Sequence, residues 1–384
     1  MEDEHVDGAA SPDRRSFLKA SSLVAIGLAL EPKNEQKVMA KFDPHTGGSN
    51  ERMDGQEPID LVNVLQGTDS TRVFSRGNTL PIAALPFGMA HWTIQSDSGT
   101  PWMFQPRERR IQGFRCTHQL SPWLSDYGQA IFLPFSGDPN PEPELRSSSW
   151  RPERADLRPY SFRLSLARYQ ADVEIVPAER CAMLKATFPD GELPGFMIDV
   201  PKGGVLASLD EARHEVRFTS TINEGGVPEN FAVYYVVRFT APWANLDTRT
   251  LPEGQAVIAR FKEGSAVEAR IATSFISFDQ AERNLDRELG TKSLEQVRTE
   301  AKTRWSEYFD RLRVEGGTEQ QQQTFYSCLY RALLFPRIWH EPDNEGNPHH
   351  FSPYSGKGVS GVMYADHGYW DVYRAWDPMM SIVF

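Results

Sequence analysis

A short segment near the end of the chain, WDVYRAWDP, carries a carboxylate beside an indole ring. Trp370, Asp371 and Arg374 stand at positions i, i+1 and i+4, which places an ion pair and a ring together at the start of a helix. An aromatic ring stacks on the C–H face of a pyranose, while a neighbouring carboxylate accepts hydrogen bonds from two hydroxyls. The spacing therefore predicts a sugar-binding pair, with a helix-capping salt bridge as the alternative.

A second group of polar residues lies in the segment from Gly113 to Gly128, GFRCTHQLSPWLSDYG. Its hydrogen-bonding side chains include those of Arg115, His118, Asp126 and Tyr127. These are donors and acceptors of the kinds that bind sugar hydroxyls. The same side chains also suit a buried network that braces the loop from within, and the residues alone leave both interpretations open.

Histidines gather in a later stretch at His340, His349 and His350, with Glu341 and Asp343 nearby. Adjacent histidines in a loop converge on one ion less well than histidines at i and i+4 of a helix. We therefore assign no metal ligand from this pattern. The sequence also contains no phosphate-binding loop, nucleophile elbow or HExxH motif.

The composition narrows the class of protein further. The 384 residues are 40% hydrophobic and 24% charged, which is ordinary for a folded protein and excludes disorder of the whole chain. A formal net charge of -11 repels phosphate backbones and argues against a nucleic-acid partner. Cys116, Cys181 and Cys328 form no CxxC pair, which argues against a zinc knuckle and leaves a disulfide open.

The beginning of the chain resembles an export signal. Arg14-Arg15 followed by SFLK matches the twin-arginine pattern, and the apolar run from Ala20 to Leu30 is too short to span a bilayer. The alternative is a chance basic pair on an amphipathic helix. We expect a signal peptide at residues 1–30, a periplasmic or secreted protein, and a disordered connector at residues 31–57. No other stretch approaches the roughly 20 apolar residues of a membrane span, so stable membrane insertion is not expected.

Residues 58–278 are expected to form a large antiparallel β-sandwich, because alternating strands follow one another at short spacing without intervening helices. The predicted strands are Ser161–Ala167, Asp172–Val176, Ala182–Phe188, Glu215–Thr219, Ala232–Thr240 and Ala266–Ile276. Turn residues such as Pro189-Asp190-Gly191 separate them. Residues 137–159 are expected to form a long surface loop.

The period changes to that of helices at residue 279. Ser293 to Gln296 and Thr318 to Gln321 are capping boxes, and Gly316-Gly317 forms a hinge between the two helices. The buried faces are expected to hold Val297, Ala301, Trp305, Tyr308 and Leu312 in the first helix, and Phe325, Leu329, Ala332 and Leu333 in the second. We expect a helical linker at residues 279–315 and the start of an all-α domain at residues 316–384.

Four segments are dense in Gly, Pro, aromatic and charged residues, namely Val62 to Met89, Gly113 to Gly128, Tyr330 to His340, and Trp370 to Pro378. Together they resemble the amino-terminal half of glycoside hydrolase family 92, a family of exo-α-mannosidases. The matching residues are Val62-Asn63, Gly67-Thr68, Pro86-Phe87-Gly88-Met89, Gly113-Phe114, Thr117-His118, Asp126-Tyr127-Gly128, Leu334-Phe335-Pro336-Arg337 and Trp370-Asp371-Val372-Tyr373-Arg374. The resemblance extends from about residue 59 to residue 384.

The resemblance implies a β-sandwich followed by an (α/α)6 barrel, with the active site between them. It also implies calcium-dependent, inverting removal of terminal α-linked mannose, often 1,2-linked, from an oligosaccharide or glycoprotein glycan. Inversion uses one carboxyl group as general acid and another as general base, far enough apart to admit water. In the family these groups and the calcium ligands lie in the barrel, beyond residue 384. We therefore expect a truncated barrel domain, with no catalytic residue, no metal ligand and no hydrolytic activity in these residues alone.

The resemblance also implies a substrate-binding role for several residues. Asp371, matched to the carboxylate of the WDxYR motif, is expected to accept hydrogen bonds from mannose hydroxyls, with Trp370 and Arg374 beside it. Trp102 is expected to lie against the sugar, and His118 and Asp126 to line the pocket. The sequence departs from the family pattern at residues 94–97, at one edge of the pocket. It also departs at residues 119–125, so its preference at the +1 sugar is expected to differ.

Two other classes of protein fit part of the sequence. A non-catalytic carbohydrate-binding module would also use an indole beside a carboxylate, and a structural envelope protein would also be exported. The apolar segment from Met379 to Phe384 requires further structure to pack on, which argues against a module. The polar and aromatic loops argue against a purely structural protein, so we expect an α-mannosidase.

Overall fold

The computed structural model describes residues 38–41, 56–71, 73–96, 103–119, 121, 126–224, 226–262, 264 and 266–384. The predicted signal peptide and Trp102 lie outside these residues. Of the predicted connector, the structure describes only residues 56–57 and β1 (Val38–Lys41), which pairs in parallel with β18 (Leu312–Glu315).

Two large antiparallel sheets dominate the fold. The eight-stranded sheet has the order β12 (Leu206–Asp210), β13 (Glu215–Ser220), β14 (Val233–Phe239), β17 (Ala266–Ser274), β10 (Cys181–Thr187), β9 (Ala171–Pro177), β8 (Ser161–Leu166) and β7 (Asp156–Arg158). The six-stranded sheet has the order β15 (Trp243–Leu251), β16 (Gly254–Phe261), β11 (Pro194–Pro201), β5 (Ala130–Ser136), β4 (Gly113–Thr117) and β2 (His91–Gln95).

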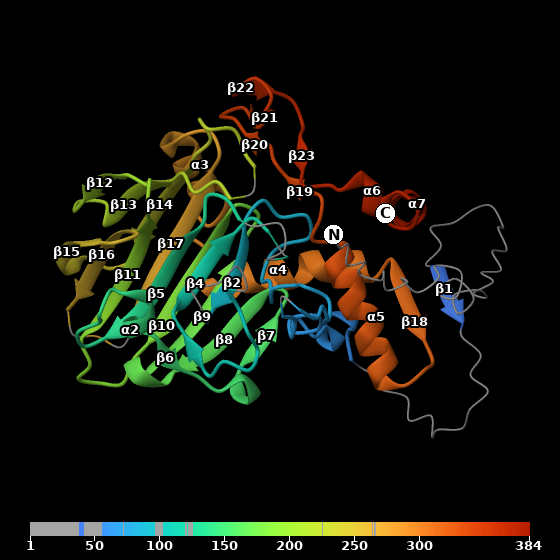
Figure 1. Ribbon diagram of the computed structural model, residues 1–384, viewed down its shortest axis with the longest axis horizontal. Coiled ribbons are helices and arrows are strands. Elements are labelled where there is room, and N and C mark those ends of the chain that lie inside the picture. Colours follow the sequence, from blue (N-terminus) through green and yellow to red (C-terminus); the bar gives the residue numbers. More distant parts are fainter. Residues whose placement is uncertain are drawn as a thin grey trace, which may run out of the picture. The chain divides into compact units, whose positions relative to one another are not determined.

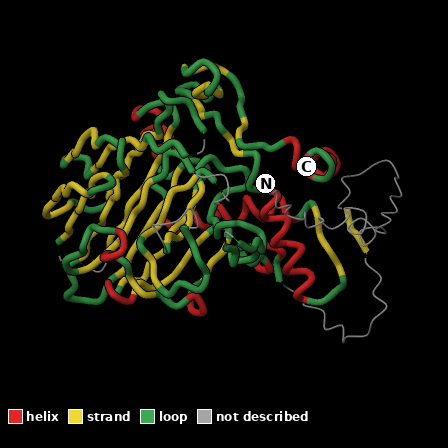
Figure 2. Tube along the Cα trace, viewed as in Figure 1, coloured by secondary structure: helices red, strands yellow, loops and turns green. Residues whose placement is uncertain are grey.

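Aromatic side chains from the two sheets meet in the core. The ring of Phe132 in β5 lies 6.4 Å from that of Phe218 in β13 and 6.1 Å from that of Tyr235 in β14, measured between centroids. Phe196 in β11 packs on Phe239 in β14 at 5.2 Å. The sheets are therefore the two layers of a sandwich, as Figures 1 and 2 show. The predicted mainly β fold with large antiparallel sheets is confirmed.

All six predicted strands belong to the eight-stranded sheet, whereas no strand of the six-stranded sheet was predicted. The outermost strand β15 has no fully buried residue, although Trp243, Leu246 and Leu251 are half-buried against the core. In β2 and β4 every residue is buried, including the polar Thr93 and Arg115. Several strands of this sheet therefore lack the alternation between a buried apolar face and a solvent-exposed polar face by which a strand is recognised in the sequence.

Helices α3 (Phe278–Glu288) and α4 (Leu294–Phe309) cover the outer face of the eight-stranded sheet. The buried residues that meet there are Val176, Cys181, Met183, Val236 and Ala272 from the strands, and Ala281, Leu285 and Val297 from the helices. The central strands of this sheet are therefore buried on both faces.

Both predicted capping boxes are confirmed. Ser293 caps α4, and Thr318 caps α5 (Glu319–Ala332), each with the reciprocal glutamine bond. The predicted helical position of Leu312 is wrong, because α4 ends at Phe309 and Leu312 begins β18. A strand can form there because Val38–Lys41 supplies a hydrogen-bonding partner.

The helices share one continuous core with the sandwich. The indole of Trp305 in α4 donates to the Ala84 carbonyl at 2.7 Å, and the Tyr330 hydroxyl in α5 donates to the Ile82 carbonyl at 2.5 Å. Trp305 and Tyr330 are fully buried. The helices that follow the predicted boundary at residue 279 therefore pack into the same core as the sandwich.

The chain between α5 and the last helices returns to the sandwich. It forms β19 (Arg337–Ile338) with β23 (Tyr364–Ala365), and a sheet of β20 (Glu341–Pro342), β21 (Pro348–Ser352) and β22 (Lys357–Ser360). It ends in α6 (Tyr369–Val372) and α7 (Trp376–Val383).

The shorter elements lie in the connections of the sandwich. They are η1 (Pro58–Leu61), β3 (Arg110–Ile111), α2 (Pro143–Arg146), β6 (Ser148–Ser149), η3 (Pro152–Arg154) and η4 (Ala167–Tyr169). The predicted loop at residues 137–159 thus contains α2, β6, η3 and β7. Among the described residues, no helix is long and apolar enough to cross a membrane.

Candidate functional site

Three of the four motif-bearing segments converge on one buried guanidinium group, that of Arg337, together with Asp366, which lies just before the fourth segment. Its Nη1 donates to the Met89 carbonyl at 2.5 Å, and its Nε donates to Oδ2 of Asp366 at 3.0 Å. Its Nη2 donates to both Asp366 and the Tyr127 hydroxyl, and that hydroxyl donates to Asp366 Oδ2 at 2.8 Å. Met89 ends the PFGM segment, Tyr127 belongs to DYG, Arg337 to LFPR, and Asp366 precedes WDVYR. Arg337 therefore ties together segments that are far apart in sequence.

Burial and charge fix the protonation of this group. Burial by itself lowers the pKa of Arg337, but Tyr127 and Asp366 oppose it, and the resulting pKa is raised. Burial raises the pKa of Tyr127 well above its ordinary value, although the charge of Arg337 acts in the opposite direction. Arg337 is therefore a permanent cation and Tyr127 a neutral phenol, and loss of the Asp366 charge would leave the cation without its counter-ion.

Asp126 braces the Gly113–Gly128 segment from inside. Its Oδ1 accepts from the backbone N–H groups of His118 at 2.9 Å and Tyr127 at 2.8 Å. Its Oδ2 accepts from the Thr117 hydroxyl at 2.8 Å and from Arg115 at 3.2 Å. The carboxylate is 1% exposed and its acceptor capacity is used. The predicted polar constellation is present, and for Asp126 its geometry favours the loop-bracing alternative over sugar contact.

His118 belongs to the same buried layer. Its Nδ1 lies 2.6 Å from the Tyr127 carbonyl, and its ring stacks on that of Tyr127 with centroids 5.1 Å apart. Burial, reinforced by the charge of Arg337, lowers the pKa of His118 to about 4. The ring is therefore neutral near pH 7, with Nδ1 as the donor. Since the side chain is fully buried, it packs behind the loop rather than at an open surface.

Trp370, Asp371 and Arg374 lie at an exposed turn of chain formed by α6. Trp370 is 84% exposed, and Asp371 and Arg374 are exposed as well. Arg374 donates to the Tyr373 hydroxyl at 2.5 Å and lies over that ring. Among the described residues no ion pair joins Asp371 to Arg374, so the capping salt bridge considered as the alternative is not formed. The indole and the carboxylate are both accessible to a ligand.

The residues around α6 hold this turn against α5. His367 Nε2 lies 3.3 Å from Oδ1 of Asp377, and the indole of Trp376 donates to the Ala332 carbonyl at 2.6 Å. The rings of His367 and Trp376 are 4.7 Å apart at 61°. Trp102, the other aromatic residue predicted at the sugar site, lies outside the described residues.

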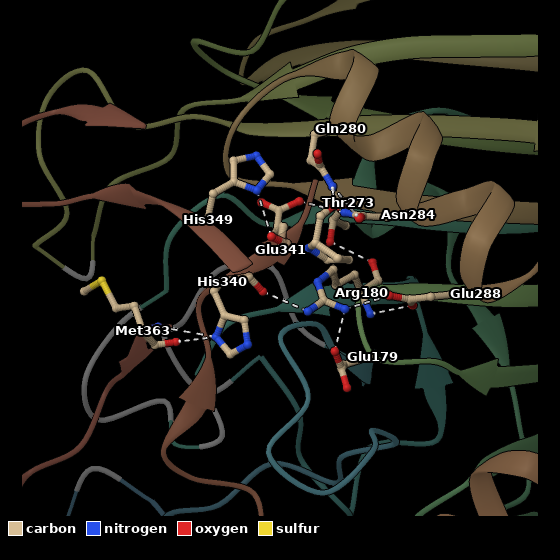
Figure 3. Close-up of polar contacts among 11 residues, drawn as sticks. Glu179, Arg180, Thr273, Gln280, Asn284, Glu288, His340, Glu341, His349 and Met363 are labelled. Atoms are coloured by element: carbon tan, nitrogen blue, oxygen red, sulfur yellow. Dashed lines mark hydrogen bonds and ion pairs between the residues drawn. The ribbon is translucent and has the colours of Figure 1, made fainter. Parts of the chain in front are cut away.

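The histidines considered as metal ligands form backbone contacts in the β20–β22 sheet. Nδ1 of His349 lies 2.8 Å from the Glu341 carbonyl, and Nδ1 of His340 lies 3.0 Å from the Met363 carbonyl, as Figure 3 shows. Nδ1 of His350 lies 2.9 Å from the Gly361 carbonyl. Within the described part of the chain, no three His, Cys, Asp or Glu residues gather in a way that could hold a metal ion.

Arg180 joins the β20–β22 sheet to the sandwich (Figure 3). Its Nη2 donates to the His340 carbonyl at 2.8 Å, and its Nη1 donates to Glu288 at 3.0 Å. Glu341 is fully buried and accepts from the Phe275 N–H at 2.8 Å and from Asn284 at 2.7 Å. Burial raises the pKa of Glu288 and of Glu341, although Arg180 opposes the shift in both.

A pocket of about 440 Å³ lies beside this junction, lined by Glu179, Arg180, Glu288 and His340 among others. Arg180 and Glu288 bond to each other, and Arg180 also pairs with Glu179. Their polar groups therefore serve as an anchor for the β20–β22 sheet. Trp370 and Asp371 do not line this pocket.

Neither Arg337 nor Asp366 is among the site residues predicted from the sequence. A signal existed for Arg337, because an arginine between Pro336 and Ile338 in an apolar stretch is typical of a buried, paired side chain. Asp366 carried no such signal, since its partner lies 29 positions earlier and is reached only after the intervening sheet folds.

Comparison with known proteins places this arrangement in a family. The family model of the glycosyl hydrolase family 92 N-terminal domain matches residues 61–290, and the model of the family's catalytic domain matches residues 280–384. The chain belongs to glycosyl hydrolase family 92.

Solved structures of the family are similar to this chain. An inverting mannosidase of family GH92 from Bacteroides thetaiotaomicron is 34% identical with a TM-score of 0.81, and the match covers 85% of this chain and 46% of that chain. An α-mannosidase of the same family and organism is 21% identical with a TM-score of 0.75, over 85% of this chain and 47% of that one. The second likeness shows the fold alone.

A curated relative is an uncharacterized secreted glycosidase from Arthroderma benhamiae. It is 23% identical over 308 residues, which make up 68% of this chain and 40% of that protein. The chain thus spans less than half the length of each of these three relatives.

Proposed function

We propose that the protein is an exported exo-α-mannosidase that removes terminal, preferentially 1,2-linked, mannose from oligosaccharides or glycoprotein glycans. The observation that carries the proposal is the 34% identity to an inverting mannosidase over 85% of this chain. The exposed pair of Trp370 and Asp371 supports it, because a ring and a carboxylate bind the apolar and polar sides of a pyranose. Export is supported by the twin-arginine pattern and by the secreted relative.

The proposed mechanism is inversion that depends on calcium. An inverting enzyme separates its acid and base carboxyls by about 6.5–9.5 Å so that water can enter between them. Calcium, when bound, supplies positive charge that orients oxygen ligands. Among the described residues, no three His, Cys, Asp or Glu side chains gather in a way that could hold a metal ion. We therefore propose that the acid, the base and the calcium ligands come from parts of the family fold that these residues do not include.

The experiment is mannose release by the full natural chain from α-1,2-, α-1,3-, α-1,4- and α-1,6-mannobiose. We expect the 1,2-linked sugar to react fastest, with β-mannose as the first product seen by NMR. EDTA should abolish release and calcium should restore it. If α-mannose appears first, inversion is wrong.

Binding without release would contradict the mannosidase proposal and support the alternative, a non-catalytic carbohydrate-binding module. Residues 1–384 alone should release no mannose with calcium present. Turnover by this shorter chain would contradict the placement of the catalytic groups elsewhere.

A further inference from the structure

The segment that carries Trp370 and Asp371 has little packing of its own. Helix α6 has four residues, and none of them is buried. Isolated helices of this length are unstable, so tertiary contacts must set the position of α6. Binding of a pyranose by a ring and a carboxylate requires both groups to be held in register with the rest of the site.

Asp366 provides such a contact on the side facing the sandwich. From Asp366 the chain runs directly to Gly368, the residue before α6, and the Asp371 N–H donates to the Gly368 carbonyl at 2.8 Å. A Cβ atom placed on Gly368 would lie 3.1 Å from Oδ2 of Asp371, so the carboxylate packs closely on this backbone. The position of the Asp371 side chain thus depends on the position of the chain at Asp366.

Arg337 determines where Asp366 lies. The guanidinium is fully buried and donates to Asp366 through both Nε and Nη2, while a third nitrogen bonds to the Met89 carbonyl of the sandwich. The Tyr127 hydroxyl adds a further bond to Asp366. A planar group with several fixed donors defines direction as well as distance, which a lysine ammonium would not do.

We propose that Arg337 is a positioning residue of the sugar site, which acts through Asp366 and the Tyr127 hydroxyl to fix Trp370 and Asp371 relative to the sandwich. The inference rests on the proposed function, because it assigns these residues to the same sugar site. It explains why three motif segments converge at this contact, since each contributes one partner to it, and Asp366 connects the contact to the WDVYR segment.

The test compares Asp366→Asn with Asp199→Asn in the full natural chain. Asp199 is a matched control, because it pairs with Arg146, which is as fully buried as Arg337, at 2.7 Å. That pair joins α2 to β11, on the opposite side of the sandwich from α6 (Figure 1). We expect Asp366→Asn to lower kcat/KM for an α-mannobiose by about 10- to 100-fold, and Asp199→Asn to change it by less than about threefold.

A second arm separates positioning from general destabilisation. If Asp366 acts through Trp370 and Asp371, adding Asp366→Asn to the double variant Trp370→Ala/Asp371→Ala lowers activity no further. Independent, multiplying losses would overturn the proposal. So would equal effects of Asp366→Asn and Asp199→Asn on kcat/KM.

Hydrogen exchange of residues 364–374 provides a readout that needs no activity. Exchange in this segment should rise in Asp366→Asn and stay at the wild-type level in Asp199→Asn. Tyr127→Phe keeps the buried ring and serves as the second variant if Asp366→Asn does not fold, with the same direction expected. Unchanged exchange of residues 364–374 in a folded variant would overturn the positioning role.

If the wild-type protein releases no mannose, the proposed function fails. Hydrogen exchange then still tests whether Arg337 positions the segment.

Discussion

At the scale of single residues, Asp371 differs from the buried carboxylates. Asp126 and Glu341 are almost fully buried and satisfy their hydrogen-bonding capacity within the protein. For either carboxylate to bind a sugar hydroxyl, it would have to give up hydrogen bonds that it already makes within the protein. Exposed Asp371 would have to displace only water. Of these acidic side chains, Asp371 is the one suited to ligand binding.

The first prediction concerns Asp371→Ala in the full natural chain. Loss of two hydrogen bonds to a charged acceptor, at about 1.5–3 kcal/mol each, should reduce kcat/KM on α-mannobiose at least about 100-fold. In residues 1–384 the same change should leave the melting temperature close to the wild-type value, because Asp371 is exposed there. Asp190→Ala, at an exposed turn, is the control and should retain activity. Activity within a few-fold of wild type would show that Asp371 does not bind the sugar.

His118 leads to a prediction about pH. Its pKa is about 4 in the folded protein and 6.5 as an ordinary value, so the unfolded chain binds a proton first as the pH falls. Its contribution to stability is therefore complete above about pH 6.5, lost progressively down to about pH 4, and constant below that. The loss from this group is about 3 kcal/mol at most.

The variant His118→Asn tests this dependence, because the amide can still donate to the Tyr127 carbonyl but does not titrate. Its free energy of unfolding, measured by urea denaturation, should be lower than that of wild type at pH 7 but should fall less between pH 6.5 and 4. An equal fall in both proteins would contradict the role of His118. His91, whose pKa is also lowered by burial, should maintain part of the dependence in the variant.

At the scale of elements, the helices differ in how they are stabilised. Helices α4 and α5 have capping boxes and buried faces, whereas α6 has no side-chain cap and no buried residue. A helix with its own cap and apolar face begins at a defined residue. The α6 turn instead depends on Asp366 and on the contacts of α7, which makes it sensitive to changes at a distance.

A prediction follows for the cap of α5. Thr318→Ala removes the hydroxyl that accepts from the Gln321 N–H and should lower the free energy of unfolding by about 1 kcal/mol. Thr324→Ala makes the same chemical change on the exposed face of α5 and should alter stability by less than about 0.5 kcal/mol. Urea denaturation of both variants would measure the difference. Equal effects would show that the capping box contributes nothing specific.

At the scale of the whole molecule, α4 and α5 complete the core of the sandwich. Trp305 is fully buried, packs on Phe309 and Tyr330, and bonds to the backbone of Ala84. One apolar cluster contains buried residues of both parts, from Ile59 to Trp339. The two parts should therefore unfold together.

Trp305→Ala tests this coupling. The cavity left by the indole should lower the free energy of unfolding by about 3–5 kcal/mol. When the wild-type protein is heated, its near-UV and far-UV circular dichroism signals should be lost at the same temperature. Trp370→Ala makes the same change at a site that is 84% exposed in residues 1–384, so it should leave the stability of these residues nearly unaltered. In the full natural chain it should reduce activity on α-mannosides. Separate transitions of the wild-type protein would contradict a common core.

Local sequence patterns alone predicted many of the strands and helix starts of this protein. Alternation predicted six of the eight strands of the eight-stranded sheet, and the capping boxes predicted the starts of α4 and α5, because these signals lie within a few neighbouring residues. The ordered motifs indicated the family, which the matches over residues 61–384 then showed. The six-stranded sheet was missed where tertiary burial of polar strands removed the local contrast on which alternation depends.

Only the tertiary structure decided which residues work together. Met89, Tyr127, Arg337 and Asp366 meet at one guanidinium although up to 277 positions of sequence separate them. Whether a carboxylate is buried like Asp126 or exposed like Asp371 is also set by what the rest of the chain packs against it. Both depend on long-range packing, because hydrogen bonds and burial are properties of neighbours in space that spacing along the chain does not specify.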